Sequence, residues 1–245
     1  MIPLNMQPIE KPVNDPDGNL DVVHVWYTLQ GEGPFAGTPA VFIRTAGCDL
    51  ACPACDSDYT TGRHLLSVPE IVAKVQSLMP NPGLVVLTGG EPLRQNIFPL
   101  MDRLAKDLGY KIQIETNGTL FPFVPDNTEY VPQSDPRTPH YTFTLVCSPK
   151  TGSINERLKP FIDHLKYIVA YDKIDPEDGL PTDSLGAGVR VARPWKGFKG
   201  QVWIQPLDEQ DEERNKLHLK AAADACLKHT DYRLTIQIHK LVGLE

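Results

Sequence analysis

Three cysteines lie close together in the first quarter of this 245-residue chain. Cys48, Cys52 and Cys55 form a C-x3-C-x2-C pattern directly after the apolar run Ala40–Thr45. A structural zinc site would need a fourth Cys or His ligand, and the next candidate, His64, comes nine residues after Cys55. Iron–sulfur clusters also usually have four thiolate ligands. Three thiolates therefore predict a [4Fe–4S] cluster with one iron open to another ligand, with a zinc site or chance clustering as the alternative.

The turn TGGEP at residues 88–92 follows another apolar run. Two adjacent glycines, Gly89 and Gly90, let the backbone approach a ligand closely. The Glu91 carboxylate can accept hydrogen bonds from an ammonium group. A tight turn with no ligand would use the same glycines. The position of the turn shortly after the cysteines favours a ligand-binding role.

Further polar residues follow later apolar runs. Glu115 and Asn117 lie at the end of one run, Ser148 and Lys150 follow the next, and Gln205 ends a later one. Each pair alone is more typical of a simple turn. In parallel α/β barrels, however, ligand-binding residues gather where the strands end. Together with the cysteines and the TGGEP turn, these residues predict one site at the carboxyl ends of the strands.

The elements that would position this site are short apolar runs separated by helix-like segments. The capping-box spacing of Ser67 and Glu70 predicts a helix that begins at Ser67. Strands covered on both faces are nearly continuous apolar runs, and alternation with helices favours a parallel sheet. We therefore expect an α/β fold, a partial parallel (βα)6-type barrel with an extra N-terminal strand. The predicted strands are Ala40–Thr45, Leu84–Leu87, Lys111–Glu115, Thr142–Cys147, Leu165–Ala170, Gln201–Gln205 and Arg233–Ile238, and the further predicted helices are Asn96–Leu108 and Asp211–Lys228.

We expect the chain to divide into an extended arm at residues 1–20, rich in Pro, Asn and Asp, and one catalytic domain at residues 21–245. Two segments rich in Pro or Gly, Phe121–His140 and Tyr171–Lys199, are expected to be surface excursions.

Composition narrows the class of protein. A net charge of −7 argues against a nucleic-acid-coating protein, because such proteins neutralise phosphates with Lys and Arg. No apolar run approaches the ~20 residues that span a bilayer, and no secretory signal is evident. We expect a cytoplasmic enzyme with a small-molecule substrate and no nucleic-acid or membrane partner. Cys147 and Cys226 stand apart and are expected to be buried free thiols.

The cysteine triplet and the TGGEP turn resemble the signatures of the radical S-adenosylmethionine (SAM) superfamily. The resemblance becomes closer when further motifs are added, and from about residue 24 onward it points to the 7-carboxy-7-deazaguanine synthase family. These motifs are YTLQGEG at 27–33, FIRTAGC at 42–48, CDSD at 55–58, ETNG at 115–118, SPK at 148–150, QP at 205–206 and HK at 239–240.

The family resemblance implies conversion of 6-carboxy-5,6,7,8-tetrahydropterin to 7-carboxy-7-deazaguanine with loss of ammonia, in queuosine-type biosynthesis. It implies a [4Fe–4S] cluster, SAM and Mg²⁺, a homodimer, and an external electron donor such as flavodoxin. No side chain is expected to be the catalytic group, because the adenosyl radical derived from SAM abstracts the substrate hydrogen.

The same resemblance implies residue roles that agree with side-chain chemistry. Glu32 can accept hydrogen bonds from the guanidine-like edge of a pterin, and Arg44 can pair with its carboxylate. A hydroxyl such as that of Ser57 suits Mg²⁺, which prefers oxygen ligands. The expected substrate-binding residues are Gln30, Glu32, Gly33, Arg44, Thr88, Gln205 and His239; the expected SAM-binding residues are Gly89, Gly90, Glu91, Glu115, Asn117, Ser148 and Lys150; and the expected metal ligands are Cys48, Cys52 and Cys55 for the cluster and Ser57 for magnesium.

Two other functions stay open at this point. A glycyl-radical activating enzyme shares the cysteine triplet but acts on a protein. A non-catalytic iron–sulfur or zinc module would carry electrons or bind a partner, and it would bind no SAM.

Overall fold

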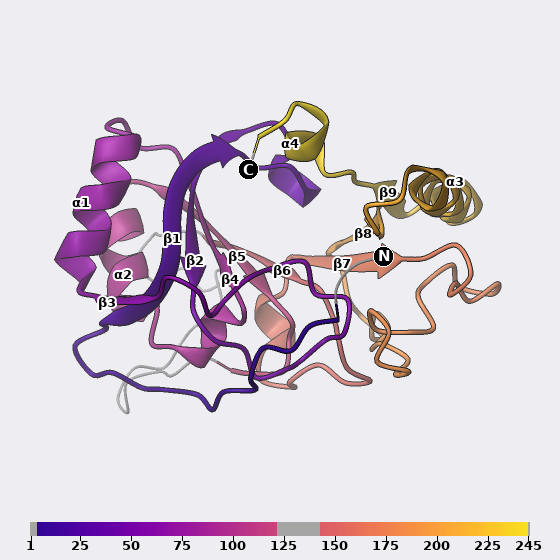
Figure 1. Ribbon diagram of the computed structural model, residues 1–245, viewed down its shortest axis with the longest axis horizontal. Coiled ribbons are helices and arrows are strands. Elements are labelled where there is room, and N and C mark those ends of the chain that lie inside the picture. Colours follow the sequence, from indigo (N-terminus) through magenta and orange to yellow (C-terminus); the bar gives the residue numbers. More distant parts are fainter. Residues whose placement is uncertain (1–3, 122–142, 245) are drawn as a thin grey trace.

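A computed structural model describes residues 4–121 and 143–244 of the chain. Its described strands form one nine-stranded sheet in the order β3-β1-β2-β4-β5-β6-β7-β8-β9 (Figure 1). The strands are β1 (Leu20–Leu29), β2 (Pro39–Thr45), β3 (His64–Leu66), β4 (Leu84–Gly89), β5 (Lys111–Thr116), β6 (Phe143–Cys147), β7 (His164–Val169), β8 (Gln201–Pro206) and β9 (Tyr232–Leu234). From β2 onward, neighbouring strands in this part of the sheet are parallel, whereas β1 pairs antiparallel with both β2 and β3.

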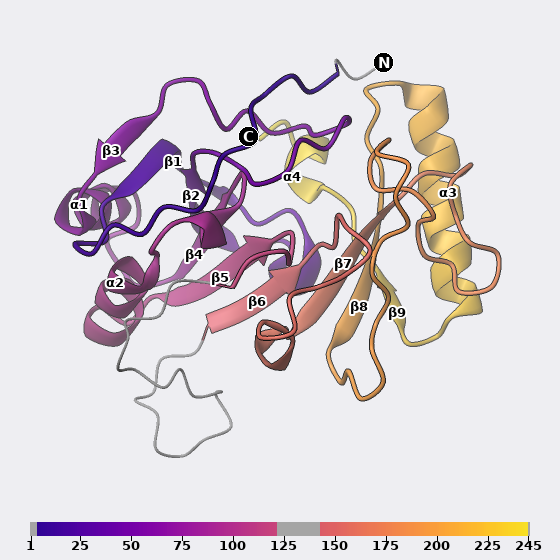
Figure 2. The ribbon, with the colours of Figure 1, turned by 90° about the horizontal axis from the view of Figure 1, so that it is seen from below.

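Apart from the short C-terminal one, the α-helices cover the outside of the curved sheet (Figure 2). The α-helices are α1 (Val68–Leu78), α2 (Phe98–Met101), α3 (Glu212–Lys228) and α4 (Ile238–Leu241), and π-helical turns, η3 (Asp102–Asp107), continue α2. Single 3-10 turns are η1 (Gly33–Phe35), η2 (Pro92–Arg94) and η4 (Lys159–Phe161). Helices α1 and α2 lie near β1 to β5, whereas α3 packs against β7, β8 and β9. None of the helices in the described ranges is long and apolar enough to cross a bilayer.

The α1 helix begins as its sequence predicts. Ser67 is the N-cap, its backbone N–H donates to Glu70 Oε2 at 2.8 Å, and its hydroxyl contacts the same oxygen at 2.6 Å. Ile71, Val72 and Val75 are buried, which places the apolar face of α1 against the main core. The near-continuous apolar run of β4 is buried on both faces, as expected for a central parallel strand.

The connections differ from six regular βα units. Between β6 and β7 there is one 3-10 turn, and between β7 and β8 the chain is irregular apart from a bridge between Ile174 and Pro181. This second segment, Tyr171–Lys199, is more than a surface excursion because Leu180 and Val191 belong to the buried core. Of the other predicted excursion, Phe121–His140, only Phe121 belongs to the described residues. Thr142, the first residue of a predicted strand, also lies outside them.

Several predicted elements have different bounds in the structure, most of them by one or two residues. The predicted strand Arg233–Ile238 ends at Leu234, and Ile238 begins α4. The reason is tertiary: beyond β9 the chain bonds to the segment after β1, where Thr235 Oγ1 accepts a hydrogen bond from the Gly33 backbone at 2.8 Å and the Ile238 N–H donates to the Gly31 carbonyl oxygen at 3.2 Å. The predicted helix Asn96–Leu108 begins at Phe98, after three residues that link it to the turn η2.

Candidate active site

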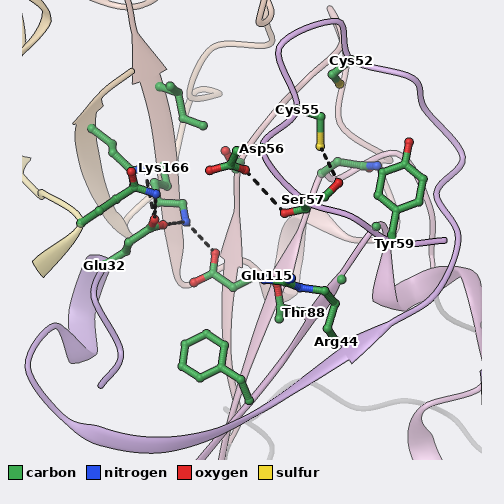
Figure 3. Close-up of a pocket in the computed structure, with 18 of the residues that line it drawn as sticks. Glu32, Arg44, Cys52, Cys55, Asp56, Ser57, Tyr59, Thr88, Glu115 and Lys166 are labelled. Atoms are coloured by element: carbon green, nitrogen blue, oxygen red, sulfur yellow. Dashed lines mark hydrogen bonds and ion pairs between the residues drawn. The ribbon is translucent and has the colours of Figure 1, made fainter. Parts of the chain in front are cut away.

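A cavity of about 500 Å³ lies at the carboxyl ends of the parallel strands. Every residue predicted to bind SAM, substrate or metal lines this cavity, with the exception of Gly33 and Glu91. The cysteine loop contributes one part of the wall, and Glu32, Glu115 and Lys166 contribute another (Figure 3). These motifs therefore lie together, as expected for ligand-binding residues at the ends of parallel strands.

The three cysteines come from a loop that has no helix or strand between β2 and β3. Cys48, Cys52 and Cys55 are all free thiols that line the cavity. Burial raises the pKa of each thiol, so a nearby cation is needed to hold them as thiolates. Within the described ranges, no group of three or more His, Cys, Asp and Glu is gathered as the ligand set of a metal ion. Three free thiols on one cavity wall fit the donor set of an iron–sulfur cluster.

The Gly-Gly turn packs tightly against the end of β2 and the start of the cysteine loop. A Cβ added to Gly90 would lie 2.1 Å from the Gly47 carbonyl oxygen and 2.8 Å from Cys48 Cβ. Gly89 has a φ of 139°, and an added Cβ there would lie 2.2 Å from the Thr45 carbonyl oxygen. No side chain fits at either position, so the turn can line the cavity with backbone beside Cys48.

The Glu91 carboxylate points into the protein and not into the cavity. Its Oε1 accepts hydrogen bonds from Leu93 N at 2.9 Å and Thr116 Oγ1 at 2.8 Å, and its Oε2 accepts one from Asn117 N at 2.7 Å. Burial raises the pKa of Glu91 to about 7, and the nearby Asp49 also raises it. In this geometry the hydrogen bonds of Glu91 join the loops after β4 and β5. Its direct contact with SAM stays a prediction.

Two polar pairs follow β5 and β6. Asn117 Nδ2 donates to Asp49 Oδ1 at 2.8 Å, which connects the loop after β5 to the cysteine loop. Lys150 Nζ donates to Ser148 Oγ at 2.6 Å and to the Ser148 carbonyl oxygen at 2.9 Å. Burial lowers the pKa of Lys150, while the adjacent Cys52 thiol acts in the opposite direction. The lysine thus brings a buried amino group to the cysteine side of the cavity.

A buried ion triad lines another part of the cavity. Lys166 Nζ lies 2.5 Å from Glu32 Oε2 and 2.9 Å from Glu115 Oε2 (Figure 3). Burial alone would raise the pKa of Glu32, but the charge and hydrogen bond of Lys166 outweigh it and lower the pKa to about 2. For Glu115 burial prevails and its pKa is raised. Gln237 Nε2 also donates to Glu32 Oε1, at 2.8 Å.

Several buried polar atoms on the cavity wall have no protein partner. Among the described residues, Gln30 Nε2, Arg44 Nε and Gln205 Oε1 are buried without a hydrogen-bond partner. The guanidinium carbon of Arg44 lies 4.9 Å from the centre of the Trp26 ring, which also lines the cavity. Buried polar groups normally have partners, so these atoms fit a polar ligand.

The magnesium candidate Ser57 lies on the cysteine loop. Ser57 Oγ is 3.5 Å from Asp56 Oδ1, and both residues line the cavity (Figure 3). Lys240 Nζ lies 3.7 Å from Asp56 Oδ2 and 2.7 Å from Asp208 Oδ2, so α4 reaches this loop from the C-terminal end of the chain. One hydroxyl and one carboxylate are oxygen donors of the kind that Mg²⁺ prefers.

His239 lies on α4 and lines the cavity. A Cβ added to Gly31 would lie 1.8 Å from His239 Nδ1, so only glycine permits this close approach. Burial lowers the pKa of His239, although the charge of Glu32 acts against that shift. Gly33, the other predicted residue outside the cavity wall, has a φ of 64° and binds Thr235 through its N–H. Gly31 and Gly33 therefore fix the C-terminal segment over the end of β1.

The sequence interpretation missed Lys166, Gln237, Trp26 and Asp56 as cavity residues. A signal existed for Lys166, because a lysine between Leu165 and Tyr167 interrupts an otherwise apolar strand, and a buried lysine requires a partner. Trp26 had no comparable signal, since an aromatic residue in a strand is more often part of the core.

The described fold resembles a solved structure. A crystal structure of QueE from Escherichia coli aligns with a TM-score of 0.65, covers 89% of this chain and 94% of that chain, and has 23% sequence identity. At this identity the match supports the fold alone, a mostly parallel partial barrel. The family model for the radical SAM superfamily matches residues 42–132.

Sequence relatives extend over nearly the whole chain. A 7-carboxy-7-deazaguanine synthase from Rhodospirillum rubrum is 40% identical over 237 residues, which are 92% of this chain and 93% of that protein. Proteins of the same name from Rickettsia prowazekii (33% identity, 92% of this chain and 89% of that protein) and Halobacterium salinarum (34%, 90% and 89%) also match. With such identity along almost its full length, this chain belongs to the 7-carboxy-7-deazaguanine synthase family of the radical SAM superfamily.

Proposed function

We propose that this chain converts 6-carboxy-5,6,7,8-tetrahydropterin to 7-carboxy-7-deazaguanine with loss of ammonia, as a step in queuosine precursor biosynthesis. The observation that carries the proposal is a single cavity that joins three free thiols to a set of buried, unpartnered polar atoms. Family membership gives this cavity its chemistry. A [4Fe–4S] cluster with SAM supplies a carbon-centred radical that abstracts a hydrogen atom from the substrate.

The cluster end of the cavity is the end that the cysteine loop lines. Cys48, Cys52 and Cys55 would hold three irons, and the open iron would take the amino acid part of SAM. The backbone of Gly89 and Gly90 lies beside Cys48 and lines the same cavity. The remaining predicted contacts to SAM come from Glu115, Asn117, Ser148 and Lys150, which line the same cavity.

The substrate end would hold the pterin by its polar edge. Glu32 stays ionised because Lys166 lowers its pKa, so it can accept hydrogen bonds from the guanidine-like edge of a pterin. The unpartnered atoms of Gln30 and Gln205 lie on the same cavity wall and would bind further polar groups of the ring. Arg44 suits the substrate carboxylate, because its guanidinium offers several donors in a planar arrangement. Thr88 and His239 complete the predicted contacts.

Magnesium would bind between the two ends. The Ser57 hydroxyl is the predicted ligand, and the neighbouring Asp56 carboxylate adds negative charge within 3.5 Å of it. Waters and substrate oxygens would supply the remaining ligands, which is the usual arrangement for this cation. We further propose that the enzyme works in the cytoplasm as a homodimer and receives electrons from a flavodoxin-like donor.

An anaerobic assay tests the proposal directly. The reconstituted protein is incubated with reductant, SAM, Mg²⁺ and the carboxytetrahydropterin, and the products are identified by mass spectrometry. We expect 7-carboxy-7-deazaguanine and ammonia in equal amounts. The matched control is Glu32→Gln, which removes the charge but keeps the side-chain size and should lose turnover while it still binds SAM. A protein that contains one zinc and no iron after anaerobic purification, or that makes no deazaguanine, would refute the proposal.

A further inference from the structure

The N-terminal arm lies against the cysteine loop. Residues 4–13 form no helix or strand apart from one bridge between Ile9 and Cys48. Their side chains alternate in exposure: Leu4 and Met6 are exposed, whereas Asn5 and Gln7 are partly buried. This alternation is typical of an extended segment with one face against the protein. The inward face of the arm meets the loop that carries the cysteines.

The arm makes a hydrogen bond close to each of the three cysteines. The Glu10 backbone N–H donates to the Cys48 carbonyl oxygen at 2.7 Å. Asn5 Nδ2 donates to the Cys52 carbonyl oxygen at 3.1 Å. Near Cys55, Gln7 Nε2 donates to the Ser57 carbonyl oxygen at 2.8 Å. Backbone carbonyls throughout the cysteine loop thus receive their hydrogen bonds from the arm.

Gln7 contacts the loop with both ends of its amide. While its Nε2 donates to Ser57, its Oε1 accepts a hydrogen bond from Tyr59 N at 2.7 Å and lies 3.3 Å from Thr60 Oγ1. Asn5 Nδ2 also lies 3.2 Å from the hydroxyl oxygen of Tyr59, whose side chain is almost completely buried. The two amides therefore connect the arm to both halves of the loop.

The loop needs such contacts because it has little regular structure of its own. No helix or strand is present from the end of β2 to the start of β3, so neither sheet nor helix hydrogen bonds fix these residues. Buried backbone groups must still be paired. A second segment helps, since the Ala54 N–H donates to the Leu185 carbonyl oxygen at 3.0 Å. The arm makes more hydrogen bonds to the loop than the segment that contains Leu185.

We propose that the N-terminal arm is a strap that positions the cysteine loop for cluster binding, with Asn5 and Gln7 as the positioning residues. Part of this inference, the effect on the cluster, rests on the proposed function. The effect on the loop itself does not. Loss of the strap should leave the sheet folded but increase the opening of the loop, and a cluster held by a loop that opens more often is lost faster in air.

The test compares Gln7→Met and the double variant Asn5→Leu/Gln7→Met with a control, Met6→Gln. Methionine is close to glutamine in length and removes only the hydrogen bonds, whereas residue 6 lies on the same arm with an exposed side chain. Hydrogen exchange measured by mass spectrometry on the cluster-free protein reports loop opening. Two ordinary hydrogen bonds are worth enough that their loss should raise exchange in peptides covering residues 46–63 about tenfold or more. Exchange in β4 and β5 should not change.

The second measurement uses the reconstituted protein. The iron–sulfur absorption of both arm variants should decay several-fold faster in air than that of the wild type and of Met6→Gln, and the thermal midpoint of unfolding should match that of the control. Loop exchange equal to that of Met6→Gln would overturn the strap. Faster loop exchange in the arm variants than in Met6→Gln, combined with the same rate of cluster decay, would also overturn it. Absence of iron from the wild-type protein would refute the proposed function instead, while the exchange measurement would still decide whether the arm holds the loop.

Discussion

Replacing Lys166 by methionine leaves two buried carboxylates without their cation. Lys166 Nζ contacts Glu32 and Glu115, and the three side chains are only 8%, 15% and 14% exposed. Methionine keeps most of the apolar stem, so the variant tests the charge and not the packing. Breaking a buried ion pair by removing one partner costs about 3–5 kcal/mol, because an uncompensated charge remains inside the protein.

The pKa of Glu32 gives an independent magnitude. It falls from an ordinary value of 4.5 to about 2 against the effect of burial, chiefly through Lys166. Since a tenfold change in an acid constant corresponds to about 1.4 kcal/mol, this fall contributes about 3 kcal/mol to folding at neutral pH. The contribution of a lowered carboxyl pKa is present above pH 4.5 and is lost as the pH falls toward about 2.

In Lys166→Met the sign of the pH dependence reverses. Burial now raises the pKa of both carboxyls, so the folded state binds protons more tightly than the unfolded state. Relative to the wild type, the variant should therefore lose stability as the pH rises from about 4.5 to neutrality. Urea unfolding followed by circular dichroism at about pH 5 and about pH 7.5 measures the difference, which we expect to be larger at the higher pH.

Two comparisons make this reasoning refutable. Lys220→Met removes a lysine from an exposed ion pair with Asp224 and should cost less than about 1 kcal/mol at either pH. Lys166→Met/Glu115→Gln should recover part of the loss, because one of the two uncompensated charges is gone. If Lys166→Met costs no more than Lys220→Met, or if its cost does not depend on pH, the triad does not stabilise the folded cavity as argued.

Three further predictions concern the roles of individual residues. Cys52→Ala should abolish both SAM cleavage and product formation, because the loss of one of three thiolates disrupts the cluster; intact iron content with full SAM cleavage would contradict the assignment. Glu91→Ala should weaken SAM binding in equilibrium dialysis. It should also lower the free energy of unfolding, because three donors lose their acceptor. Glu32→Ala, in contrast, should impair turnover and leave SAM binding largely intact. Equal losses of SAM affinity in the two variants would show that one of them is misassigned. Ser57→Ala should keep the cluster and SAM binding but raise the magnesium concentration needed for half-maximal rate, whereas Ser57→Thr should stay active; an unchanged magnesium dependence in the alanine variant would remove Ser57 from the metal site.

Much of the fold and of the site follows from local sequence signals. The capping box of Ser67 and Glu70 needs only residues three positions apart, and the structure contains it as expected. Most of the predicted strands are recognisable because a buried parallel strand is apolar on both faces. The gathering of Cys48, Gly90 and Ser148 at one cavity follows from topology, since parallel strands end on the same side of the sheet.

Features that depend on distant partners could not be predicted in this way. The ion pair of Lys166 joins residues 134 positions apart, and nothing near the lysine identifies Glu32 as its partner. The early end of β9 depends on Thr235, which binds Gly33 across 202 positions. The direction of the Glu91 carboxylate depends on hydrogen bonds from Thr116 and Asn117, which come 25 and 26 positions later. Each case is set by tertiary contacts that override the local pattern.

The order of the strands also has a consequence for biosynthesis. Apart from β3, which lies at the edge beside β1, the strands from β2 to β9 follow the order of the chain, so each of them can pair with the one before it as it leaves the ribosome. The arm, the cysteine loop and the strands through β6 all come from the first 150 residues. Glu32, in contrast, accepts hydrogen bonds from Gln205 and Gln237, which are synthesised 173 and 205 positions later. Apart from the bond to Leu185, translation can therefore assemble the arm and the cysteine loop well before the residues that hold Glu32.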